Sequence, residues 1–229
     1  MYILHIETST KVCSVALSNG LEVLDHEELQ EGLNHTALLA PMIEGVLTKC
    51  RVKTTDLKGI AVSSGPGSFT GLRVGSSTAK AMAYSLGIPI LPVPTLYALA
   101  VAAFEKYPSA TLAMPMIDAR RNEVYTGVYE ADGKEIMSVS SLILEESTFM
   151  GLLPISTTVI VCGDGAKKFP AHLNPGNIVV DSAVQSSALH LIGPANRMME
   201  EREFGDAMHF VPFYLKPPNI TQPKAKSLS

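Results

Sequence analysis

The chain contains no tryptophan, and only 6% of its residues are aromatic. It has three cysteines, Cys13, Cys50 and Cys162, which lie far apart in the sequence. Their spacing matches neither a zinc site nor a thiol redox motif. We therefore interpret them as reduced thiols buried in apolar surroundings.

An excess of positive charge is also absent, since 18 basic residues stand against 22 acidic ones and the formal net charge is −4. A protein that binds nucleic acid by itself needs a positive field to neutralise phosphates. We therefore expect any RNA to be bound only indirectly, with the help of another protein.

No apolar run reaches the length needed to span a membrane. The first residues, Met1 to His5, show neither a basic segment nor a small-residue cleavage site, and they lead directly into Glu7. We expect a cytoplasmic protein that makes no contact with a membrane.

Strand-like and helix-like segments alternate along the 229 residues, of which 46% are hydrophobic. An apolar strand ends at Glu7, a polar corner follows, and a second strand precedes the turn at Gly20. The same order recurs at Asp118, where an apolar strand, a polar corner and another strand precede Gly133. Such an internal repeat indicates duplication of one α/β unit. We predict an N-terminal lobe at 1–108, a C-terminal lobe at 109–215 and a flexible tail at 216–229.

A glycine-rich run, Gly65 to Gly75, is the most specific segment of the sequence. Glycines before a helix expose backbone N–H groups at its positive end, which can hold a phosphate, although no Gly-Lys-Ser/Thr sequence completes a Walker A loop. A tight strand-to-helix turn is the alternative. The residues that could contact a phosphate or nucleotide are Gly65, Gly67, Ser68, Glu7 and Asp118.

The helix that follows this run has small residues four apart, which would let another helix approach its backbone closely. The second helix would be the one predicted from Thr36 to Cys50, in this chain or in a partner. We favour such a helix-packing interface over a pocket. Its candidate residues are Leu39, Met42, Ile43, Val46, Gly71, Leu72, Gly75, Ala79, Met82 and Ala83.

Five segments carry a resemblance that covers nearly the whole chain, namely Glu7–Ser9, Asn34–Thr36, Gly65–Gly75, Ile117–Tyr125 and Val211–Leu215. Together they resemble the TsaB family, also called YeaZ. The family is a degenerate paralogue of TsaD, the enzyme that places a threonylcarbamoyl group on the adenosine beside the anticodon in certain tRNAs. The resemblance implies the two-lobe actin-like ATPase fold (ASKHA, ribonuclease H-like) with duplicated βββαβαβα lobes.

The resemblance further implies a non-catalytic scaffold that activates the complex forming tRNA N6-threonylcarbamoyladenosine. The chain would bind a TsaD-type catalytic subunit and work with a TsaE-type P-loop ATPase, and it would meet tRNA only through the complex. No intrinsic cofactor is implied, although ATP or ADP could lie at the interface of the complex. The isolated chain could form a homodimer through the helix-packing interface described above.

The catalytic paralogue holds a metal with two histidines four apart on a helix, a spacing that puts both rings on one face. The matching stretch here, Pro94 to Leu99, has neither histidine. We therefore expect no metal site and no catalytic residue. The turn Gly163–Gly165 resembles a place where relatives contact adenosine, but we interpret it as structural.

Two enzyme hypotheses remain open. Actin-like ATPases carry an aspartate at the end of the first strand, where this chain has Glu7, one methylene longer. Asp118 could serve a phosphate site, or it could pair with Arg120 or Arg121. The chain could thus be an ATP-dependent phosphotransferase or ATPase that uses Glu7, Asp118 and the loop at Gly65. A metallopeptidase is the weaker alternative, because the histidine pair is missing.

Overall fold

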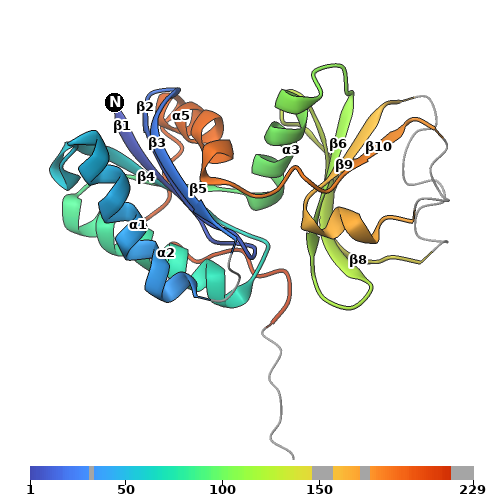
Figure 1. The fold of residues 1–229 in the computed structure, drawn as a ribbon, viewed down its shortest axis with the longest axis horizontal. Helices are drawn as coiled ribbons and strands as arrows, with labels where there is room; N and C mark the ends of the chain where they lie inside the picture. Colours follow the sequence, from blue (N-terminus) through green and yellow to red (C-terminus); the bar gives the residue numbers. More distant parts are fainter. Residues whose placement is uncertain (31–33, 146–156, 171–175, 218–229) are drawn as a thin grey trace, which may run out of the picture.

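The computed structural model describes residues 1–30, 34–145, 157–170 and 176–217, and they form two lobes that lie side by side (Figure 1). Each lobe is built on a mixed sheet of five strands. The predicted α/β fold with two lobes is confirmed. Within the described residues, no helix is both long and apolar enough to cross a membrane.

The N-terminal sheet has the strand order β3-β2-β1-β4-β5. Strand β2 is antiparallel to both of its neighbours, β1 and β3, whereas β4 and β5 run parallel to β1. The carboxyl ends of β1, β4 and β5 therefore meet at the edge of the sheet that faces the other lobe (Figure 1). The strands are Tyr2–Glu7 (β1), Cys13–Asn19 (β2), Glu22–Leu29 (β3), Leu57–Ser63 (β4) and Ile90–Val93 (β5).

Two helices cover one face of this sheet, as the apolar spacing of the sequence predicts. Helix α1 spans His35–Cys50, and α2 spans Phe69–Leu86 and ends at Gly87 in the left-handed conformation. A short 3-10 helix, η1 (Thr54–Asp56), leads into β4. The side chains between sheet and helices form the largest core cluster, which includes Leu4, Ile6, Val15, Leu39 and Val46.

The C-terminal sheet has the order β10-β9-β6-β7-β8, so that β6 lies in its centre as β1 does in the first sheet. The sheets thus repeat one topology. Where the first lobe has α2, the described residues between β9 and β10 include the 3-10 helix η2 (Asp164–Lys168), and residues 146–156 and 171–175 lie outside the described part. The strands are Leu112–Asp118 (β6), Glu123–Glu130 (β7), Glu135–Ile143 (β8), Val159–Cys162 (β9) and Ile178–Asp181 (β10).

The lobes exchange helices. Helix α3 (Thr95–Lys106) follows the last strand of the first sheet, yet it packs on the second sheet, with Leu99 and Ala103 against Ile117 and Ile160. The 3-10 helix η4 (Ala188–Leu191) and α5 (Ile192–Glu201) follow β10 and pack on the first sheet. The expected C-terminal lobe of 109–215 differs from the structure here, because the chain returns to the first lobe after β10.

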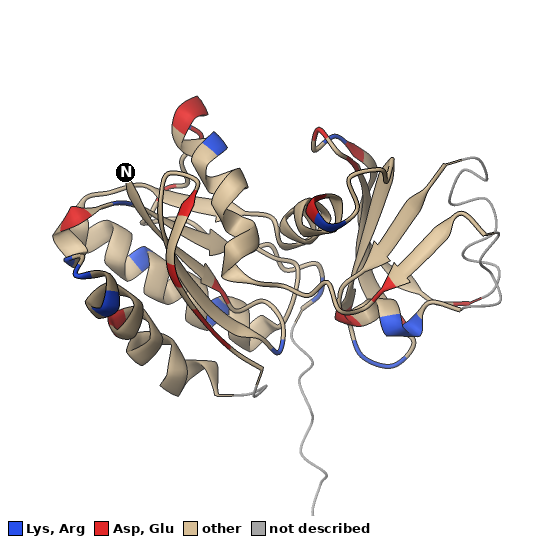
Figure 2. Ribbon diagram, turned by 45° about the horizontal axis from the view of Figure 1, so that its top comes forward, with Lys and Arg blue, Asp and Glu red and all other residues tan. Residues whose placement is uncertain are grey.

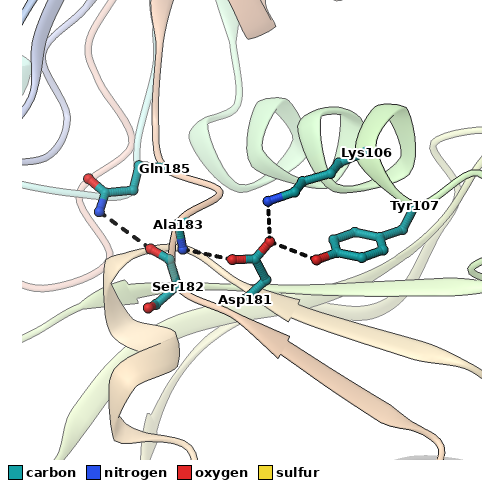
Figure 3. Close-up of polar contacts among 6 residues, drawn as sticks. All are labelled: Lys106, Tyr107, Asp181, Ser182, Ala183 and Gln185. Carbon is teal, nitrogen blue, oxygen red and sulfur yellow. Dashed lines mark hydrogen bonds and ion pairs between the residues drawn. The ribbon is translucent and has the colours of Figure 1, made fainter.

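A polar cluster secures α3 to the second sheet (Figure 3). Asp181, at the end of β10, accepts hydrogen bonds from Lys106 Nζ at 2.6 Å and from Tyr107 Oη at 2.8 Å. Its other oxygen accepts from the Ala183 amide at 2.9 Å, which turns the chain back toward the first lobe. One carboxylate therefore ties the helix to the start of the returning segment.

The last described residues run along the first lobe. Gly205 forms a bridge with Ile90, and the Phe213 amide donates to the Ser64 carbonyl at 2.7 Å. Phe213 itself is half exposed. Of the predicted tail at 216–229, only Lys216 and Pro217 lie in the described part of the chain.

Candidate functional site at the facing corners

The polar corner after β1 is sealed inside the protein. Glu7 is 1% exposed, and one of its carboxylate oxygens accepts hydrogen bonds from the Ser9 amide and hydroxyl, both at 2.6 Å. Burial raises the pKa of Glu7, although the bonds from Ser9 and from Ser63 oppose that rise. Glu7 therefore binds its own loop and is turned away from solvent.

Two small residues of α2, Gly71 and Gly75, face this corner. A Cβ at Gly71 would overlap the carbonyl oxygen of Thr8, and one at Gly75 would overlap the Thr8 hydroxyl. A Cβ at Gly67 would overlap the Ser9 carbonyl. The close approach predicted from the glycine spacing exists, but it joins the helix to the end of β1 in the same chain.

The backbone amides of the glycine-rich run are largely used within the chain. The Ser68 amide donates to the Ser9 carbonyl at 2.6 Å, and the Gly65 amide donates to the Thr95 hydroxyl at 3.1 Å. The Gly71 amide donates to the Ser68 side chain, which caps α2. This arrangement favours the interpretation of the run as a packing device that locks α2 to the corner after β1.

The corner after β6 is open, in contrast. Asp118 accepts from Lys168 Nζ at 2.6 Å and from the Arg120 amide at 2.7 Å. Partial burial opposes the ionisation of Asp118, but these bonds and the charges of Lys168 and Lys11 hold its pKa below the ordinary value. The ion pair forms with Lys168, whereas the sequence suggested Arg120 or Arg121. Both arginines are exposed and have positive φ angles, 73° and 49°.

The turn Gly163–Gly165 packs on the end of β6. A Cβ at Gly163 would overlap the Met116 carbonyl, so the turn needs glycine for the same reason as the loop in the first lobe. Asp164 follows and accepts from the Asp118 amide at 2.9 Å. Burial raises the pKa of Asp164, and the nearby charge of Asp118 adds to the effect. The predicted structural role of this turn agrees with its contacts.

The candidate interface residues lie mostly inside the chain. All are buried except Met82, which is partly exposed, and their contacts are with the sheet and with each other. The outer faces of α1 and α2 instead border a groove of about 440 Å³, which the sequence did not reveal. An interface on these helices stays a prediction, and the groove shares Ile43 and Met82 with the predicted residues. The groove is lined by Ala40, Ile43, Glu44, Leu47, Thr48, Val52, Thr54, Thr78 and Met82.

A second, larger cleft of about 760 Å³ lies between the lobes, where α5 and the carboxyl ends of β4 and β5 face the β7–β8 turn. Its wall includes Gly65, Pro94 and Tyr97, and its rim carries Arg197 and Glu201. It depends on the exchange of helices between lobes, so no local sequence signal indicates it.

The stretch that matches the metal-binding helix of the catalytic paralogue forms the first turn of α3. Leu96 and Leu99 of that turn are buried apolar side chains. In the part of the chain that the structure describes, no three His, Cys, Asp or Glu side chains gather as a metal site would require. His5 is buried against Ser18, and His35 contacts the Val12 carbonyl.

The fold and the position of the two corners together define the structural class of the protein. Two sheets of one topology, each with a corner at the end of its central strand facing the other lobe, are the architecture of actin-like ATPases. The activator of 2-hydroxyisocaproyl-CoA dehydratase from Clostridium difficile, solved with bound ADPNP, has this fold, with a TM-score of 0.52 at 11% identity over 89% of this chain and 96% of that one.

The family follows from closer relatives. The model of the family "TsaD: tRNA N6-adenosine threonylcarbamoyltransferase" matches residues 30–192. The tRNA threonylcarbamoyladenosine biosynthesis protein TsaB of Escherichia coli is 33% identical over 221 residues, which cover 94% of this chain and 95% of that protein. A Pseudomonas aeruginosa protein described as similar to peptidase YEAZ superposes with a TM-score of 0.81 at 26% identity, over 94% of this chain and 99% of that one. The chain belongs to the TsaB family, also called YeaZ, within the wider family of TsaD-like proteins.

Proposed function

We propose that the chain is the non-catalytic partner of a TsaD-type transferase in the biosynthesis of tRNA threonylcarbamoyladenosine. The observation that carries the proposal is the similarity to TsaB of Escherichia coli along nearly the whole chain. The geometry supports it, because the first corner, where an actin-like ATPase would act on a phosphate, is closed by the chain's own groups.

The outer faces of α1 and α2 are the surface that we propose for the transferase. The groove between them is largely apolar, and Ile43, Leu47 and Met82 supply its floor beside exposed threonines. Apolar grooves between helices are common sites for partner helices. In the absence of the transferase, a second copy of the chain would compete for the same face.

The test is binding of the purified chain to the TsaD-type protein of the same genome, measured by calorimetry. Thr78→Glu places a charge in the groove and should weaken binding at least about tenfold, since burying an unpaired carboxylate is costly. Ser77→Glu adds the same charge at the neighbouring exposed position of α2, which does not line the groove, and should bind as the wild type does.

Three results would count against the proposal. Failure of the wild type to bind would contradict the partner role. Equal binding by Thr78→Glu and wild type would move the interface elsewhere. Hydrolysis of ATP by the chain alone, abolished by Asp118→Asn, would instead support the ATPase alternative.

The further components of the complex are proposals as well. A TsaE-type P-loop ATPase would be the third subunit, and ATP or ADP would bind where the subunits meet. The ATPase and the nucleotide are each titrated into the assembled pair and into the chain alone. Binding of nucleotide to the isolated chain would place the nucleotide site in this subunit.

A further inference from the structure

Basic side chains gather where the two lobes face each other, although the protein as a whole is acidic. Lys168 and Lys216 both contact Glu123 of β7, and Lys168 also binds Asp118. The charge of Lys11, from the other lobe, helps to lower the pKa of Asp118 and offsets part of the rise that burial causes in the pKa of Asp164. We call this the basic corner surface; it consists of Lys11, Arg120, Arg121, Lys167, Lys168 and Lys216.

The surface has a positive balance that its acidic neighbours do not cancel. Six cations stand against Asp118, Glu123 and Asp164, which is a formal charge of +3 in a chain whose total is −4. Figure 2 shows the blue segments of the β6–β7 corner and of η2 on the side of the second lobe that borders the first. The charge is therefore local, and it spans both lobes.

Four of these cations are free to meet a partner. Lys11, Arg120, Arg121 and Lys167 are exposed, and none of them forms an ion pair with another described residue. The two arginines sit on a tight corner, held by the bond from the Arg120 amide to Asp118. A fixed corner that carries two unpaired guanidinium groups is suited to phosphate oxygens.

A partly exposed aromatic ring, that of Tyr125 in β7, lies near two of the cations. It is close enough to Lys216 and Arg120 for their charges to lower its pKa, although burial raises it more. Cations interleaved with aromatic faces are typical of surfaces that bind single-stranded nucleic acid.

We propose that the basic corner surface binds the phosphate backbone of an RNA, with Lys11 reaching it from the first lobe and Arg120 and Arg121 from the second. The inference rests on the proposed function, because the transferase would bring its tRNA to this subunit. An acidic protein would also suit the charge, but the partly exposed ring of Tyr125 near Arg120 and Lys216 favours nucleic acid.

The test measures binding of an unmodified tRNA transcript to the complex of this chain with its TsaD-type partner, by fluorescence anisotropy between 50 and 200 mM salt, the range being about that over which counterion release is resolved. Arg120→Gln/Arg121→Gln should weaken binding about tenfold at the lowest salt and reduce the slope of log K against log salt by roughly two. Glutamine keeps the side-chain length while removing the charge.

A matched control removes two cations elsewhere. Arg197→Gln/Arg202→Gln changes the net charge equally at the end of α5, and it should leave both the affinity and the slope unchanged. An equal loss in both double variants would show only a long-range effect of net charge and would overturn the proposal. Unchanged tRNA binding by Arg120→Gln/Arg121→Gln would overturn it as well.

Failure of the proposed function is recognised separately. If the wild-type chain does not bind the TsaD-type protein in calorimetry, the partner role is wrong whatever the RNA result. The same double variants are then compared as isolated chains over the same range of about 50 to 200 mM salt, where a smaller slope for Arg120→Gln/Arg121→Gln still supports the surface and an equal slope refutes it.

Discussion

The two corners at the centre of the molecule have similar origins and opposite environments. The corner after β1 is covered by the loop that opens α2, and Glu7 is hidden beneath it. The corner after β6 lies beside η2, and Asp118 and the arginines that follow are exposed to solvent. One copy of a duplicated unit thus became part of the core, whereas the other kept a charged surface.

The largest loss of stability should come from disrupting the packing of α2 on the corner after β1. Gly71→Ala puts a methyl group into the Thr8 carbonyl oxygen, and backbone cannot move aside as a flexible side chain would. We expect a loss of about 3 kcal/mol in the free energy of unfolding, measured with urea. Gly193→Ala, in α5 with no atom within 4 Å, should be neutral or stabilising by up to about 1 kcal/mol. Equal stability of Gly71→Ala and wild type would refute the packing role.

Substitution of the buried Glu7 should have a smaller effect on stability, and this effect should depend on pH. Because the folded pKa of Glu7 lies above the unfolded value of about 4.3, its contribution is complete below that pH and is lost as pH rises toward the folded pKa. Glu7→Gln does not ionise, so its stability relative to wild type should improve between pH 4 and pH 7.5, the lower limit being roughly the unfolded pKa. Urea titrations at both pH values test this. A constant difference would mean that Glu7 has an ordinary pKa.

Substitution at the open corner, after β6, should change stability with the opposite pH dependence and by the smallest amount. Asp118 has a lowered pKa, so its contribution is present above the unfolded value and is lost as pH falls through the folded one. Asp118→Asn should cost about 0.5 kcal/mol near neutral pH, since the pair with Lys168 is partly solvated, and nothing in strong acid. A double-mutant cycle with Lys168→Gln isolates the pair, and additive effects would show that it contributes nothing.

Much of the fold could be predicted because its signals are local. The alternation in β1 and β2, the apolar spacing of α1 and the turn at Gly20 are each encoded within a few residues. Strand β8 was not predicted, since Glu135–Ile143 is mostly partly exposed and lacks a clear alternation. The glycine-rich run correctly indicated close packing, but its partner was wrong, because spacing shows which residues share a face and not what that face meets.

The candidate sites depend on contacts between residues far apart in the sequence. The interface residues were chosen as the apolar face of α1 and α2, and this face is the one that the chain buries against its own sheet. The groove lies at the outer edge of the same helices, and its lining combines Ile43 and Met82 of the predicted set with polar residues such as Thr78.

By itself the sequence determined most of the strands and helices, the turns, the duplication and the family, because periodicity, glycine positions and motifs are local properties. Only the tertiary structure decided that α3 covers the second sheet and α5 the first, that Glu7 is sealed while Asp118 is open, and that the charge of Lys11 acts on Asp118 of the other lobe. These outcomes are set by long-range packing, in which each surface is covered by whichever element buries the most apolar area against it.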